Sequence, residues 1–145
     1  MVATLTLCAI VVMMGVPLLS LMLEAHGMAK VMAPVVSEGA LVMERMIREL
    51  RQADAGSLQL SAGSIAFSTP TGQRRLHQTG GDAGIYLVQE TEERLLTRSV
   101  EVGSLSFMRW ADLPGLVGIS FTLSAPLADG SRIRTPLSSA VHVIR

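Results

Sequence analysis

The sequence predicts an α+β fold in which a long N-terminal helix, first transmembrane and then amphipathic, packs on a small antiparallel β-sheet head. Residues 2–23 carry no charged side chain, and an apolar stripe at the helical period follows them. From residue 57 onward apolar and polar residues alternate, which is typical of half-buried strands. We therefore expect residues 1–24 to form a transmembrane anchor helix, 25–55 its amphipathic continuation and 56–145 a β-rich globular head.

The uncharged N-terminal run is long enough to cross a bilayer, because a helix rises about 1.5 Å per residue and the hydrocarbon core is about 30 Å thick. A cleaved signal peptide would need a basic segment, and none precedes Val2. A buried core helix would not need so long a run. We favour a membrane-spanning anchor over both alternatives. The residues expected to pack in the membrane or in a filament bundle are Leu5, Leu7, Ile10, Val11, Met14, Gly15, Pro17, Leu18 and Leu21.

A glycine and a proline interrupt this run, at Gly15 and Pro17. Proline removes a backbone donor, which a membrane helix tolerates where neighbouring helices satisfy the freed carbonyl. The interruption therefore favours a helix packed among similar helices. Orientation stays open: basic residues follow the run and by the positive-inside rule place the head in the cytoplasm, whereas a basic leader upstream of Met1 would place it outside.

The second helical segment is amphipathic. Its apolar stripe, which we expect to pack on the sheet as core, consists of Val36, Ala40, Met43, Ile47 and Leu50. The opposite face is charged and is interpreted as solvated. On it, Glu44–Arg48 and Arg45–Glu49 have the spacing of helical ion pairs, each worth about 0.2–0.5 kcal/mol. Gly56 is expected to stop the helix.

The remainder predicts a succession of short antiparallel strands. Turn signals separate them, at 70–72, 80–82 and Asp129-Gly130. The clearest strand is 118–124, in which Ile119, Phe121 and Leu123 point to one side and small polar residues to the other. Pro136 places the start of the last strand at an edge or bulge. The strands expected lie around 65–67, 74–77, 85–89, 94–98, 105–109, 118–124 and 138–144, the last with Val141 and Val143 on the core face.

Composition and motifs argue against catalysis. Twelve basic residues balance twelve acidic ones, so no nucleic-acid partner is indicated. Cys8 is the single cysteine, which excludes an intramolecular disulfide and a cysteine zinc cluster. The histidines, at 26, 77 and 142, have no metal-binding spacing, and the sequence contains no phosphate-binding glycine loop or nucleophile elbow. We predict a protein without catalytic residues, metal or cofactor.

Two polar features allow more than one interpretation. The acidic stretch 90–93 is interpreted as a solvated turn, with a cation site built from carboxylate oxygens as the alternative. Trp110 is interpreted as a core residue, with a partner contact as the alternative.

Three parts of the chain together resemble one family. The uncharged run 2–23 continues directly into an amphipathic helix, and residues 43–53, MERMIRELRQA, end it in an R-x-L-R-Q-A pattern. Residues 117–145 form a V-x-I-x-F-T-L strand, a Gly turn and a Thr/Ser-rich strand ending near Arg. In these features the chain resembles the type IV pilin superfamily, in particular its minor pilins and the minor pseudopilins of type II secretion. The family's basic leader, cleavage Gly and early Glu are missing or degenerate at 1–4, and we expect the native N-terminus to lie upstream.

The resemblance implies a pilin-like fold and a structural role in the assembly or priming of a type IV pilus or type II secretion filament. It implies an inner-membrane, single-pass protein with a periplasmic head, found in a filament or at its tip. The implied partners are other pilin or pseudopilin subunits, the inner-membrane assembly machinery and membrane lipid. The alternative is a generic single-pass scaffolding or adaptor protein of the cell envelope with a β-rich head.

Overall fold

The computed structural model describes the backbone of residues 2–113, 115–127 and 129–143 and, within them, the side chains from Leu21 onward except that of Glu24. This part of the chain is a mixed helix and sheet structure in which one N-terminal helix packs on antiparallel sheet. Its elements are α1 (Val2–Arg51), the 3-10 turn η1 (Ala55–Ser57), β1 (Gln59–Ser61), β2 (Ser64–Thr69), β3 (Gly72–Gln78), β4 (Ile85–Gln89), β5 (Glu92–Thr97), β6 (Ser106–Arg109), β7 (Leu116–Pro126) and β8 (Arg132–His142).

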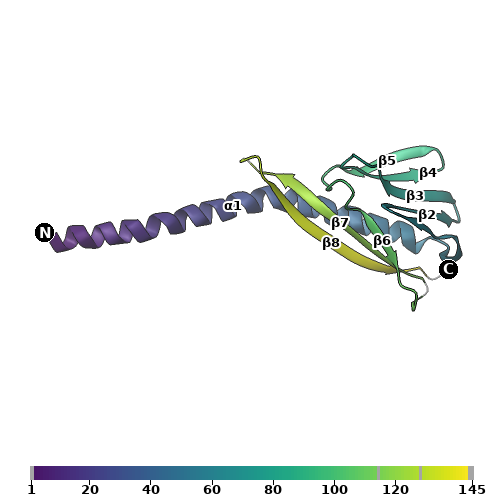
Figure 1. Ribbon diagram of the computed structural model, residues 1–145, viewed down its shortest axis with the longest axis horizontal. Helices are drawn as coiled ribbons and strands as arrows, with labels where there is room; N and C mark the ends of the chain where they lie inside the picture. Colours follow the sequence, from purple (N-terminus) through teal and green to yellow (C-terminus); the bar gives the residue numbers. More distant parts are fainter. Residues whose placement is uncertain (1, 114, 128, 144–145) are drawn as a thin grey trace.

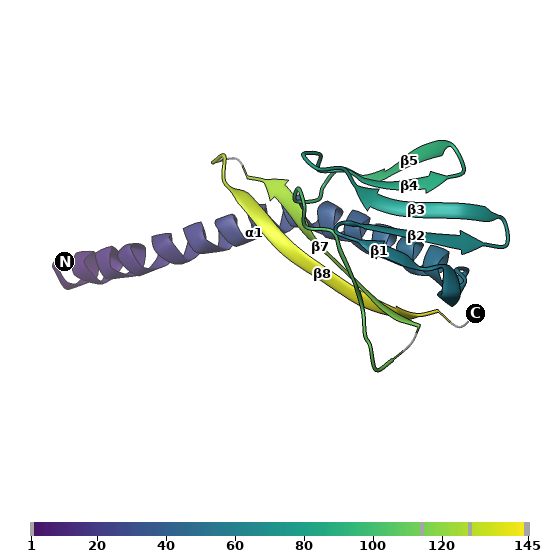
Figure 2. The same cartoon turned by 45° about the vertical axis from the view of Figure 1, so that its right-hand side comes forward.

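The strands form two sheets where the sequence suggested one. A five-stranded meander has the order β1-β2-β3-β4-β5, and a three-stranded sheet has the order β6-β7-β8. The C-terminal part of α1 lies along both sheets, the long β7–β8 hairpin crosses it obliquely, and its N-terminal part projects beyond them (Figures 1 and 2). Below, the head means the two sheets together with the part of α1 that they cover.

The sheets are separate because the chain between β5 and β6 pairs only briefly with β7. Val100 forms an isolated bridge with Leu123. On either side, the Glu101 N–H donates to the Thr122 carbonyl at 2.8 Å and the Ser124 N–H to the Ser99 carbonyl at 2.9 Å. These contacts are too few to continue either ladder, but they fix where the two sheets meet.

The last strand begins six residues earlier than expected and carries Pro136 in its interior. Pro136 lies opposite Thr122, whose N–H and C=O are turned away from β8 toward Ser104 and Glu101. The pair is therefore one that exchanges no ladder hydrogen bond, and the missing proline N–H points to the free edge of the sheet. An edge position tolerates proline, and it also removes a donor that another strand could use.

The core lies between α1 and the inner faces of both sheets. The expected alternation holds in β7, since Ile119, Phe121 and Leu123 are at most 1% exposed. The other fully buried side chains with under 2% exposure include Met46, Leu50, Ile65, Leu76, Ile85, Val100 and Val117. Val141 and Val143 are also buried.

The core-facing stripe of α1 differs from the one expected. Met43 and Leu50 are buried, and Val36 and Ile47 are half-buried against the core, but Ala40 is exposed. Gly39 is buried in its place, and Val42 and Met46 complete the stripe. Both stripes have the helical period and share Met43 and Leu50, so periodicity alone does not distinguish them. The close approach of β7 selects the stripe that passes through Gly39, the smaller residue.

Gly39 is where the helix enters the head. A Cβ at this position would lie 2.5 Å from Leu123 Cδ1 and 2.9 Å from Leu137 Cδ1. Leu123 is fully buried, so it can move aside only by disturbing the rest of the core. The absence of a side chain at Gly39 therefore sets how closely the β7–β8 hairpin approaches α1.

We expect Gly39→Ala to destabilise the head by about 1–3 kcal/mol, because overpacking at this contact outweighs the helix propensity that alanine adds. The matched control is Gly27→Ala in the same helix, where an added Cβ meets nothing within 4 Å. Thermal unfolding followed by circular dichroism should show a lower melting temperature than the wild type for Gly39→Ala and no decrease for Gly27→Ala. Equal melting temperatures for the two variants would contradict the role of this contact.

Candidate functional site: the projecting helix and its attachment to the head

The N-terminal part of α1 projects beyond the sheets (Figure 1), and several of its described side chains are apolar and exposed to solvent. Leu21, Met22 and Leu23 are 63%, 70% and 71% exposed, and Met28 and Val31 are exposed farther along. Isolated exposed apolar residues are ordinary, but such a series on a helix that has left the head is typical of an interaction surface.

The packing residues expected from the sequence lie at the start of this helix. Leu21 is exposed, as required for contact with lipid or a neighbour. Within the described side chains, no helical segment is long and apolar enough to cross a membrane. The remaining predicted residues lie outside the part whose side chains are described: Leu5, Leu7, Ile10, Val11, Met14, Gly15, Pro17 and Leu18.

An ion pair joins the last turns of α1 to β3. Arg74 Nη1 donates to Glu49 Oε2, and the two side chains are only 11% and 13% exposed. Arg74 lies opposite Phe67 in the β2–β3 register and therefore on the inner face, toward the helix. The expected pairing of Glu49 with Arg45 is replaced by this longer-range contact, because the helix packs on β3 with Glu49 facing the sheet.

Arg45 lies on the same side of α1 as Glu49 but in a different environment. Burial, together with the nearby Arg94 of β5 and Arg48, lowers the pKa of the Arg45 guanidinium from its usual value. Its Nε has no hydrogen-bond partner among the described atoms. About two helical turns before Arg45, Glu38 Oε2 accepts a hydrogen bond from the Ser99 hydroxyl at 3.3 Å. This side of α1 was expected to be solvated. Instead, Glu38, Arg45 and Glu49 are half-buried against the five-stranded sheet and the segment that follows β5.

A groove of about 460 Å³ runs between α1 and β8. Its helix wall combines apolar Met43 and Ile47 with the exposed Arg48, and its β8 wall contains Leu137 and Ser138. Ala40, expected in the core, lines this groove instead. Because α1 forms one wall of the groove and β8 the other, the shape of the groove depends on how α1 packs against β8.

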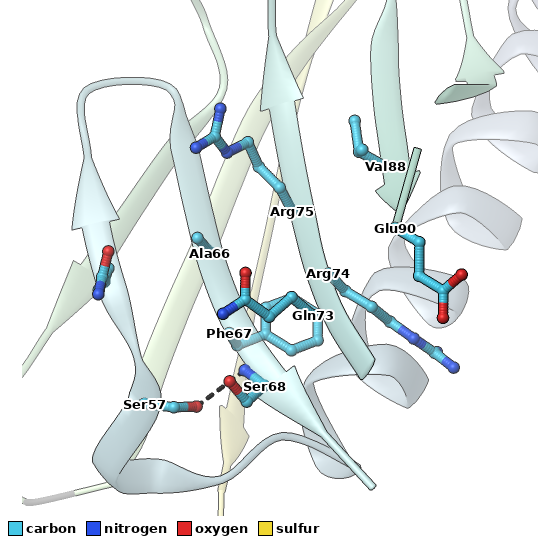
Figure 3. A pocket seen from close by; sticks show the side chains of 10 residues that line it. Ser57, Ala66, Phe67, Ser68, Gln73, Arg74, Arg75, Val88 and Glu90 are labelled. Carbon is cyan, nitrogen blue, oxygen red and sulfur yellow. Dashed lines mark hydrogen bonds between the residues drawn. The ribbon is translucent and has the colours of Figure 1, made fainter. Parts of the chain in front are cut away.

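A second hollow of about 400 Å³ lies on the five-stranded sheet, where Gln73, Arg74, Arg75 and Glu90 line it beside Ser57 (Figure 3). The Ser57 hydroxyl donates to the Asp54 carbonyl at 2.8 Å and accepts from the Ser68 N–H at 2.8 Å. The hydroxyl thus connects the end of η1 to β2. Its bonding is that of a structural serine, because both partners are backbone groups.

The titratable residues are dispersed over the described chain. His26 lies on the projecting helix, His77 on β3 and His142 on β8. His77 Nε2 lies 3.1 Å from Glu93 Oε1, and its ring stacks on Tyr86 with a centroid distance of 5.6 Å. Of the expected acidic turn, only 90–91 forms the turn, since Glu92 and Glu93 begin β5. The described residues hold no group of three metal-ligating side chains.

Sequence reasoning missed the residue that ties the two sheets together. The Gln78 amide donates to the Glu101 carbonyl at 2.9 Å and to the Asp82 carbonyl at 3.2 Å, and it accepts from the Leu105 N–H at 3.1 Å. One side chain thus satisfies three backbone groups of the connecting segments. A lone glutamine at the end of a strand carries no sequence signal for this role.

Comparison of the chain with protein-family models, curated proteins and solved structures found no match. Function is therefore inferred from the chain's own residues. Those residues form a helix whose described side chains are exposed and partly apolar from Leu21 to Val31 and buried farther along, where Gly39 packing and the Glu49–Arg74 pair hold it.

We expect Arg74→Met to lower the free energy of unfolding by about 3 kcal/mol, because it leaves the carboxylate of Glu49 largely buried without its partner. The double variant Glu49→Leu with Arg74→Met should lose much less than the sum of the two single changes. Urea unfolding measures both, and Glu44→Ala, an exposed charge on the same helix, should change stability by under about 0.5 kcal/mol. Additive losses would show that the two side chains do not act as a pair.

A pH dependence follows from Asp82. The Tyr86 hydroxyl donates to this carboxylate and, with the Gly84 N–H, holds the pKa of Asp82 below its usual value. Ionised Asp82 therefore contributes stability above its unfolded pKa of about 4, and that contribution is lost as the pH falls through the lower folded value. Tyr86→Phe should flatten the decline of the urea midpoint on the acid side of pH 5. An unchanged decline would show that this hydrogen bond does not cause the loss of stability at acid pH.

Proposed function

We propose that the protein is a structural, non-enzymatic subunit of a type IV pilin-like filament, a minor pilin or a minor pseudopilin of type II secretion. It takes part in filament assembly or priming. The observation that carries the proposal is the exposed apolar series Leu21–Met22–Leu23 on a helix that projects from a packed head. An apolar helix presented in this way gains free energy by entering lipid or a bundle of similar helices.

The proposed arrangement anchors the protein in the inner membrane through the start of α1, with the head in the periplasm. The partners are then membrane lipid, other pilin or pseudopilin subunits and the inner-membrane assembly machinery. Apolar packing supplies the driving force as the helix moves from lipid into the filament bundle. The ion pair of Glu49 with Arg74 and the packing at Gly39 support this role, because they keep the head at a fixed orientation to the projecting helix.

We expect a photoreactive amino acid introduced at Met22 or Met28 to form adducts with filament subunits or the assembly machinery in the native cells. Both side chains are exposed on the projecting helix. The same probe at Ser131, in the exposed β7–β8 turn, is the control for random collision and should give a different or weaker set of adducts. Mass spectrometry of the adducts identifies the partners. Adducts confined to one envelope protein unrelated to filaments would favour the adaptor alternative.

A further inference from the structure

The only tryptophan of the chain lies on the outer surface of the three-stranded sheet. Trp110 follows β6 directly and is 37% exposed, so its expected place in the core is wrong. The edge of its six-membered ring lies against Gly118 of β7, where a Cβ would come within 2.7 Å of Trp110 Cη2. A glycine near the start of the central strand thus gives the indole a place on the sheet.

The strand register arranges uncharged residues beside the indole in two cross-strand rows. One row is Met108, Gly118 and Ala140, and the next is Ser106, Ser120 and Ser138. Neighbouring strands lie about 4.8 Å apart, so three hydroxyl groups span roughly 10 Å. These residues line a shallow cavity of about 320 Å³ whose lining includes Trp110 and no charged side chain.

The serines of this row differ from those that stabilise the fold. Ser104 donates to the Glu101 carbonyl at 2.7 Å, and Ser57 donates to the Asp54 carbonyl. Across the described residues, no hydrogen bond of this kind engages the hydroxyls of Ser106, Ser120 and Ser138. Each hydroxyl can both donate and accept, so the row offers a ligand several hydrogen bonds of either direction.

We propose that this cavity binds a neutral saccharide, with one face of a sugar ring against Trp110 and its hydroxyl groups on the serine row. A sugar ring has an apolar C–H face and a polar rim, which matches one aromatic wall and one row of hydroxyls. The uncharged lining gives an ionic ligand no counter-charge. The proposal does not depend on the function proposed above, since it uses only the outer face of β6–β8.

An apolar protein segment fits the cavity less well. Covering the serine row with apolar side chains would remove water from three hydroxyls and return no hydrogen bond, and each such loss is unfavourable. The exposed Met108 at 56% adds apolar area beside the indole, but the row that follows it is entirely polar. A sugar ring fits both rows at once, because its C–H face can cover the apolar row while its hydroxyl groups meet the serine row.

The single tryptophan provides the measurement. The full chain is kept in lauryldimethylamine oxide, whose headgroup carries no sugar, and titrated with maltotriose, cellotriose and the trimer of N-acetylglucosamine. We expect at least one of them to shift the Trp110 emission to shorter wavelength in a saturable way, with a dissociation constant of roughly 1 mM, which is weak binding. No saturable shift with any of the three would overturn the proposal.

Two variants locate the site. Ser120→Ala removes the central hydroxyl and should weaken binding about threefold to tenfold. Ser124→Ala, on the same face of β7 but outside the cavity, should leave it unchanged. Gly118→Val should displace the indole and abolish the response; its circular dichroism must match that of the wild type. Equal affinity for Ser120→Ala and wild type would overturn saccharide binding at this cavity. So would an emission shift produced by an apolar peptide and by none of the three saccharides.

Discussion

The close packing of α1 on the β7–β8 hairpin at Gly39 is the constraint on which the rest of the structure depends. Well before this point described side chains such as Leu23 are exposed, and after it Met46 and Leu50 are completely buried. A single continuous helix thus changes from a segment that projects beyond the sheets to the wall of a core. Because it does not break between the two parts, the direction in which the apolar half projects is set by how the buried half packs.

Contacts at three separate places make that direction specific. Gly39 fixes the helix against the three-stranded sheet, and the Glu49–Arg74 pair fixes its end against the five-stranded sheet. Gln78 then joins the segments that connect the two sheets. A lone apolar helix could rotate or slide on a β surface at small cost, since dispersion contacts are nondirectional. Directional polar contacts at the end of the helix remove that freedom.

The regular parts of the fold could be predicted from the sequence because they depend on local periodicity. Alternation at 119–123 placed three side chains correctly in the core, and the turn residues Asp129-Gly130 placed the last hairpin. Other features depend on partners distant in the chain. The partner of Glu49 lies 25 residues away, and although Pro136 indicated an edge or a bulge, its place in the interior of β8 depends on its pairing with Thr122. The choice of Gly39 over Ala40 likewise depends on the approach of Leu123.

The candidate site, like the fold, could be predicted from the sequence only in part. The sequence predicts an uncharged N-terminal helix suited to a membrane or a filament bundle, because absence of charge is a local property, but it gives no sign of which surfaces the head presents. The outer face of β3–β5 carries Arg75, His77 and Glu93, whereas that of β6–β8 carries hydroxyls, an indole and no charge along its central rows. Contacts made by the first face weaken as salt screens them, and contacts made by the second do not. The two sheets of the head therefore present outer faces of different chemistry, one charged and one uncharged along its central rows.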